Sequence, residues 1–163
     1  VRQGDPGVSC RREDREIDGV LVRLSGREGG TELDVALTVR CDGQRFNDGK
    51  ADPQGRFWVG TLDDAREPDA ALYCYADGDL RRVAAGITVS NGLAWSPDGG
   101  TMYWSDTKAH QVFAFDFDPE AGSLSRQRVF AQFVPRAAGQ SLDDYGGRPD
   151  GAAMDSEGGY WVA

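Results

Sequence analysis

The chain has 163 residues, of which 39% are hydrophobic and 28% charged, a length that suits one globular domain. Its 18 basic and 27 acidic residues give a formal charge of −9, which disfavours nucleic acid and anionic membranes as partners, because both depend on Lys and Arg near phosphate. No apolar run reaches the length of a membrane span, and the three cysteines form no C-x-x-C pair. We therefore expect reduced thiols in a cytoplasmic protein.

A strand–turn–strand pattern repeats along the chain from residue 47 onward. Each unit has a short strand, a tight turn that begins with Asp or Ser and ends with Gly, and a second strand with an aromatic pair. The three stretches read NDGKADPQGRFWV from Asn47, NGLAWSPDGGTMYWS from Asn91 and DGAAMDSEGGYWV from Asp150. This repetition indicates three copies of one structural unit.

Two further strands complete each of the first two units, at 71–75 and 80–84 and at 111–117 and 125–131. Each complete unit is therefore predicted to be a four-stranded antiparallel sheet, and no segment shows a helical period with caps. Four-stranded sheets that repeat every ~40–50 residues are typical of β-propeller blades. A β-sandwich is the alternative, although sandwich strands seldom repeat their turn chemistry unit by unit.

The predicted fold is thus all-β, and the chain forms a single partial β-propeller domain with about three blades. Its parts are an incomplete leading blade, two blades and the start of the next blade, at residues 1–46, 47–90, 91–149 and 150–163. Six blades of ~45 residues need about 270 residues, and a half-propeller exposes two long sheet edges that favour aggregation. We therefore expect the sequence to be part of a longer gene product.

One chemical type of residue recurs at the same place in every unit. Counting back five residues from the start of each turn gives Asn47, Asn91 and Asp150. The first strand of each propeller blade lines the central channel, so residues at one end of these strands form a ring. A turn-forming Asn or Asp explains any single one of them. Three in register indicate a shared site.

The ring offers amide and carboxylate oxygens, which are the ligands that hard divalent cations prefer. A set dominated by Asn leaves residual positive charge on the cation, which lets it polarise a carbonyl and lower the pKa of a bound water. Asp150 would then accept a proton from the attacking water. Arg45 lies two residues before Asn47, so both share a face of an extended strand, and its guanidinium would hold substrate oxygens. A surface Arg is the alternative.

Other catalytic chemistries lack residues in this chain. His110 is the one histidine, which leaves Ser-His-Asp and zinc–histidine chemistry without candidates. No G-x-S-x-G, Walker A or G-x-G-x-x-G motif is present. The sequence therefore favours a site of oxygen ligands.

Three motifs resemble the gluconolactonase/regucalcin (senescence marker protein) family. They read RFNDGKADPQGRFWVGT from Arg45, SNGLAWSPDGGTMYWSDT from Ser90 and PDGAAMDSEGGYWVA from Pro149, within a match over roughly 18–163. The resemblance implies a six-bladed propeller with one divalent cation in its channel, usually Ca²⁺, with Zn²⁺, Mn²⁺ or Mg²⁺ in some members.

The resemblance also implies roles for individual residues. Asn91 and Asp150 fall on metal-ligand positions, and Asp150 is also the general base. Arg45 and Asn47 match positions that hold the oxygens of a sugar lactone. In related phosphotriesterase propellers the position of Asn47 also faces the metal. We therefore take Asn47, Asn91 and Asp150 as the candidate metal ligands.

Two family positions have no clear counterpart. The remaining metal-ligand Glu of the family lies in a Glu-Gly-Pro-like motif, which nothing among residues 1–40 matches, and Glu13 and Glu16 stand in a charged stretch without that context. A further family acid, which touches substrate, falls near Ala65. Three neighbouring acids could replace it: Asp63, Asp64 and Glu67.

We therefore predict a lactonase, a carboxylic ester hydrolase of carbohydrate metabolism that opens a sugar lactone to the aldonic acid by attack of a metal-activated water on the lactone carbonyl. Two alternatives stay open. One is a phosphotriesterase-like hydrolase on the same site, and the other is a non-catalytic propeller that binds calcium or a protein partner. The natural lactone, the metal, the oligomeric state and the activity of this stretch alone are not determined by the sequence.

Overall fold

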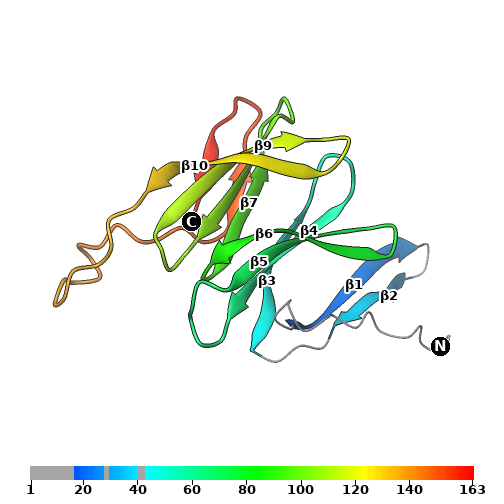
Figure 1. Cartoon of the computed structure of the whole chain (residues 1–163), viewed down its shortest axis with the longest axis horizontal. Helices are drawn as coiled ribbons and strands as arrows, with labels where there is room; N and C mark the ends of the chain where they lie inside the picture. The colour runs from blue at the N-terminus through cyan, green and yellow to red at the C-terminus, as the bar shows by residue number, and fades with distance from the viewer. Residues whose placement is uncertain (1–16, 28–29, 40–42) are drawn as a thin grey trace.

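The computed structural model describes residues 17–27, 30–39 and 43–163, which contain strands and turns and no helix (Figure 1). None of these described segments could therefore cross a membrane as a helix. The strands are β1 (Ile17–Arg27), β2 (Gly30–Val39), β3 (Gln44–Ala51), β4 (Phe57–Asp63), β5 (Ala70–Ala76), β6 (Asp79–Ile87), β7 (Ser90–Trp95), β8 (Thr101–Asp106), β9 (Gln111–Asp118), β10 (Ser123–Gln132), β11 (Ala152–Met154) and β12 (Tyr160–Val162).

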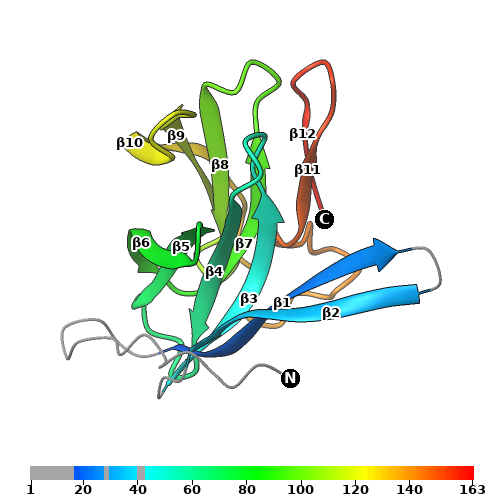
Figure 2. The same cartoon turned by 90° about the vertical axis from the view of Figure 1, so that its right-hand side faces the viewer.

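Three groups of antiparallel strands follow one another along the chain. Strands β3–β6 pair in chain order, β7–β10 form a separate four-stranded sheet, and β11 pairs with β12. The β1–β2 hairpin extends the first sheet through a short parallel pairing of Ile17 and Asp18 in β1 with Gln44 and Arg45 in β3. The first strands of the three groups, β3, β7 and β11, lie side by side (Figure 2). An all-β fold with four-stranded antiparallel sheets is therefore confirmed.

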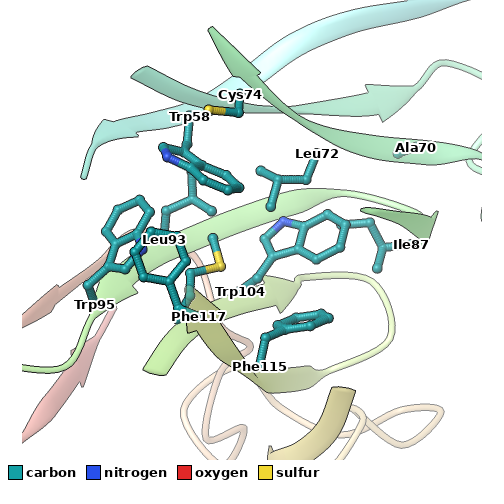
Figure 3. Packing of buried hydrophobic residues seen from close by; sticks show 11 residues of the cluster. Trp58, Ala70, Leu72, Cys74, Ile87, Leu93, Trp95, Trp104, Phe115 and Phe117 are labelled. Atoms are coloured by element: carbon teal, nitrogen blue, oxygen red, sulfur yellow. The ribbon is translucent and has the colours of Figure 1, made fainter. Parts of the chain in front are cut away.

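The hydrophobic core fills the space between the two larger sheets (Figure 3). Trp58 from β4, Trp95 from β7 and Phe117 from β9 meet edge to face, with ring centroids 5.8–5.9 Å apart. Trp104 and Leu72 pack beside them and are fully buried. Edge-to-face aromatic contacts of this kind add to the free energy of burial, so the sheets are joined by apolar packing.

The turn that recurs in the sequence is built around one acidic side chain. Asp52 is buried, and its Oδ1 accepts hydrogen bonds from the backbone N–H groups of Gln54 and Arg56, at 3.0 and 2.9 Å. Its Oδ2 accepts from Arg56 Nε at 2.6 Å and from Trp58 Nε1 at 2.9 Å. The turn therefore also fixes the tryptophan of the following strand.

The other two units use variants of the same turn. In the third unit Asp155 Oδ2 accepts from Trp161 Nε1 at 2.7 Å, the same six-residue separation as in the first unit. This bond, with that from the backbone N–H of Gly159, holds the pKa of the Asp155 carboxyl below its ordinary value. In the second unit Ser96 Oγ accepts from Thr101 N at 2.9 Å, and Met102 takes the place of the tryptophan.

Two arginines of the first sheet fasten the hairpin between β9 and β10. Arg56 Nη2 donates to the carbonyl of Pro119 at 2.8 Å, and Arg81 Nη2 donates to the carbonyl of Gly122 at 2.9 Å. The Arg56 guanidinium also lies 5.7 Å from the centre of the Phe117 ring. A cation over an aromatic ring is attracted by the ring electrons. The two sheets are therefore held together by polar contacts at the rim of their apolar core.

Replacement of Asp52 by Ala is expected to lower the free energy of unfolding by about 3 kcal/mol, because it leaves Arg56 Nε and the indole N–H of buried Trp58 without their acceptor. Urea denaturation followed by tryptophan fluorescence measures the change. Asp155→Ala is the matched control, since the same turn there orients the exposed Trp161, and we expect a smaller loss. Equal losses would show that the contribution of the turn to the free energy of unfolding does not depend on its burial.

Candidate functional site

Both predicted asparagine sites coincide with irregularities in strand pairing. The register between β3 and β4 shifts between Phe46 and Gly49, a stretch that includes Asn47. The register between β7 and β8 shifts immediately after Asn91, which itself still pairs with Ser105. Such bulges re-aim side chains and are frequent beside functional sites. The two asparagines are thus placed where the sheet can direct them out of the regular ladder.

Asn47 and Asn91 are in direct contact, although they come from different sheets. Asn47 Nδ2 donates to the backbone carbonyl of Ser90 at 2.8 Å and to Asn91 Oδ1 at 3.1 Å. The Nδ2 of buried Asn91 donates to Thr107 Oγ1 at 2.7 Å. Both amide nitrogens are therefore satisfied by protein acceptors, and within the described residues no group donates to Asn47 Oδ1.

Asp150 precedes the third strand pair, and its backbone lies beside Gly92, the residue after Asn91. Its backbone N–H donates to the carbonyl of Ala163 at 2.9 Å, and its carbonyl oxygen would be 3.0 Å from a Cβ added to Gly92, the residue after Asn91. Lys50 Nζ of β3 donates to the carbonyl of Ala152 at 2.7 Å, which ties the first and third units together. The Asp150 carboxylate is exposed and makes no hydrogen bond or ion pair with the described part of the chain.

Arg45 points its guanidinium at an acid that sequence reasoning left undetermined. Its Nε lies 3.3 Å from Asp64 Oδ1, and both side chains are more than half exposed. Asp63 is buried instead, and its Oδ2 accepts from the backbone N–H of Glu67 at 3.0 Å, which closes the turn after β4. Of the three neighbouring acids, Asp64 is the one paired with Arg45. The other acids considered earlier, Glu13 and Glu16, lie outside the described residues.

The donor set fits a hard divalent cation. Asn91 offers an oxygen on an amide whose nitrogen is already satisfied, and Asp150 offers an unpaired carboxylate; oxygens of these types are the usual ligands of Ca²⁺. A cation at Asn91 Oδ1 would replace the hydrogen bond from Asn47 Nδ2. No group of three or more His, Cys, Asp or Glu in the described ranges could bind a metal. The candidate ligands in these ranges therefore combine the amide oxygens of Asn47 and Asn91 with the carboxylate of Asp150.

Tyr160, which sequence reasoning treated only as part of an aromatic pair, holds the third unit against the second. Its Oη donates to the carbonyl of Gly92 at 2.7 Å and lies 3.1 Å from Ser105 Oγ. Burial raises the pKa of Tyr160 to about 12, with the negative charge of Asp48 adding to the effect. The sequence pattern shows the aromatic residue five positions after the start of the turn at Asp155. It does not show that this residue contacts Gly92.

Residues 13–163 match the family described as SMP-30/Gluconolactonase/LRE-like region. The chain belongs to this family. A 6-deoxy-6-sulfogluconolactonase of Pseudomonas putida is 45% identical over 121 residues, which cover 73% of this chain and 38% of that protein. The chain therefore spans well under half the length of this relative.

Two solved structures share the fold. A luciferin-regenerating enzyme superposes with a TM-score of 0.70 at 31% identity, over 88% of this chain and 50% of that one. Regucalcin of Agrobacterium tumefaciens, described as a calcium-binding protein, superposes with a TM-score of 0.63 at 26% identity, over 91% of this chain and 51% of that one. The predicted family and the predicted β-propeller class are thereby confirmed. The roles assigned to Arg45, Asn47, Asn91 and Asp150 stay predictions.

Replacement of Gly92 by Ala is expected to lower the free energy of unfolding by at least ~2 kcal/mol. Gly92 has a φ of 61°, and a Cβ there would lie 2.5 Å from Ser105 Oγ and 2.6 Å from Tyr160 Oη. Urea denaturation provides the measurement. Gly151→Ala is the matched control, because a Cβ there meets nothing within 4 Å, and it should leave stability unchanged. A neutral Gly92→Ala would contradict the close packing described here.

The raised pKa of Tyr160 predicts a pH dependence of stability. Because its folded-state pKa of about 12 lies above the ordinary value of 10.0, its contribution is complete below pH 10 and is lost as the pH rises toward 12. The loss should not exceed about 2–3 kcal/mol. Unfolding free energies of wild type and Tyr160→Phe, compared from pH 9 to 12, isolate this group from the other titrating residues. Parallel curves would contradict the prediction.

Proposed function

We propose that this protein hydrolyses a sugar lactone to the aldonic acid, using a divalent cation held by Asn47, Asn91 and Asp150. The contact between the Asn47 and Asn91 amides, with the backbone of Asp150 close to Gly92 and its carboxylate exposed, is the observation that carries the proposal. The related sulfogluconolactonase supports the substrate class, and the calcium-binding regucalcin supports a cation, for which we favour Ca²⁺ over Zn²⁺, Mn²⁺ or Mg²⁺.

The reaction needs a base and an activated carbonyl. A bound divalent cation supplies Lewis acidity to the carbonyl oxygen and lowers the pKa of water. Asp150 accepts a proton from the attacking water, whose oxygen bonds to the lactone carbonyl carbon. The bond between that carbon and the ring oxygen then breaks, and the ring oxygen takes up a proton to become a hydroxyl. One lactone and one water thus give one aldonic acid.

The exposed side chains of Arg45 and Asp64 would orient the sugar. The Arg45 guanidinium donates to substrate oxygens, and Asp64, at 3.3 Å from its Nε, keeps it aimed and accepts hydrogen bonds from sugar hydroxyls. Asn47 presents its Oδ1, which has no protein donor among the described residues, to the cation or to the substrate. Lactone recognition would therefore rest on the end of β3 and on the turn after β4.

The expected cellular location and partners rest on composition and on the state of one cysteine. A cytoplasmic setting is consistent with Cys74, a buried free thiol whose pKa is raised by burial. The net charge of −9 argues against nucleic acid and anionic membranes as partners. These statements stay predictions.

Asp150→Asn is expected to lower kcat for aldonolactone hydrolysis by roughly 10²–10⁴-fold, because an amide cannot accept the proton from water. Acid release followed with a pH indicator measures the rate on the purified protein. Asp143→Asn, which removes an exposed carboxylate from the preceding loop, is the matched control and should keep wild-type activity.

EDTA should abolish activity, and added CaCl₂ should restore it. Lactonase activity that persists in EDTA, or an Asp150→Asn variant as active as the Asp143→Asn control, would refute the proposal. If the protein hydrolyses a phosphotriester and none of the lactones tested, the phosphotriesterase-like alternative is the correct one.

A further inference from the structure

The turn between β8 and β9 contacts the back of the Asn91 amide. Thr107, the first residue after β8, is 7% exposed, and its Oγ1 accepts the hydrogen bond from Asn91 Nδ2 at 2.7 Å. Asn91 itself is 6% exposed. An amide nitrogen this deeply buried requires an acceptor, because leaving it unpaired costs free energy. Thr107 provides the acceptor that the structure shows.

The position of Thr107 is itself fixed relative to β7. Its backbone N–H donates to the carbonyl of Val89, two residues before Asn91, at 3.1 Å. The buried carboxylate of Asp106 accepts from the backbone N–H groups of Thr88 and Val89, at 2.7 and 3.2 Å. The turn and the entry to β7 are thus joined by hydrogen bonds at Asp106 and at Thr107. The backbone of Thr107 is therefore held at a fixed distance from β7, which keeps its hydroxyl within reach of Asn91.

The Ser90 carbonyl determines which amide atoms of Asn47 and Asn91 are nitrogen and which are oxygen. The Ser90 carbonyl can only accept, so the atom that Asn47 directs at it must be Nδ2. That nitrogen also donates to Asn91, so the Asn91 atom facing Asn47 is Oδ1, and Nδ2 must point at Thr107. The chain of contacts Ser90–Asn47–Asn91–Thr107 therefore turns the Asn91 oxygen toward Asn47 and away from Thr107.

We propose that Thr107 is a positioning residue that sets the cation affinity of the site by holding the Asn91 amide oxygen toward Asn47. The proposal rests on the proposed function, because it requires a cation at Asn91. Partners that orient a metal ligand typically change metal affinity by 10–100-fold when they are removed. Valine has the shape of threonine but no acceptor, so it would leave Asn91 Nδ2 buried and unpaired whenever the oxygen faces the cation.

The test is Ca²⁺ binding by isothermal titration calorimetry with CaCl₂ alone, which does not depend on turnover. Thr107→Val should weaken Ca²⁺ binding by 10–100-fold, and Thr107→Ser, which keeps the hydroxyl, should bind within about threefold of wild type. Thr88→Val is the matched control, because Thr88 is also buried just before β7 and its side chain makes no hydrogen bond to Asn91. Circular dichroism verifies that each variant is folded.

Each outcome separates this inference from the proposed function. Wild-type affinity in Thr107→Val, or equal weakening in Thr107→Ser and Thr88→Val, would overturn the role of Thr107 and leave the proposed function intact. A wild-type protein that binds no Ca²⁺, Zn²⁺, Mn²⁺ or Mg²⁺ would refute the proposed cation site and this inference together. If Thr107→Val does not fold, the smaller Thr107→Ala substitution takes its place with the same expected loss.

Discussion

Strand β7 packs against neighbours on both sides at distances that only glycine allows, and the candidate site exists because of this packing. On one side a Cβ at Gly60 of β4 would lie 1.5 Å from Ser90 Oγ. On the other side a Cβ at Gly92 would lie 2.5 Å from Ser105 Oγ and 3.0 Å from the Asp150 carbonyl. Any larger side chain at these glycines would push the sheets apart. The amides of Asn47 and Asn91 could then no longer touch.

The apolar core and the polar site are separate parts of the same interface between sheets. The aromatic cluster around Trp58 and Trp95 lies between the sheets and supplies the apolar burial (Figure 3). The polar groups gather where strand pairing is interrupted, so their hydrogen bonds are made to side chains and to carbonyls of the next strand. This division lets the core hold the sheets rigidly while the site residues face a ligand.

An amide-rich site suits hydrolysis better than tight storage of a cation. Two neutral amides and one carboxylate leave a divalent cation with net positive charge, and that charge is what polarises a carbonyl. Carboxylate-only sites bind Ca²⁺ more strongly and offset more of its charge. Neutral asparagines at two of the three proposed ligand positions are therefore the feature that most favours the lactonase proposal over a calcium-binding role alone.

The repeat, the turns and the all-β fold were readable from the sequence, because each depends on residues only a few positions apart. The Asp52 turn and its six-residue link to Trp58 are local chemistry, and local chemistry repeats visibly. The same regularity put Asn47, Asn91 and Asp150 in register.

Contacts between distant segments were not readable in this way. The bond between Asn47 and Asn91 spans 44 residues, and the choice of Asp64 over Asp63 depends on which of them the turn after β4 buries. Thr107 ends the second family motif but had no role assigned to it, and the contact between the β8–β9 turn and Val89 brings it to Asn91. Such contacts come from the packing of one sheet on the next, which sequence periodicity does not encode. Periodicity can propose the members of a site, whereas the approach of the strands decides which of their atoms meet.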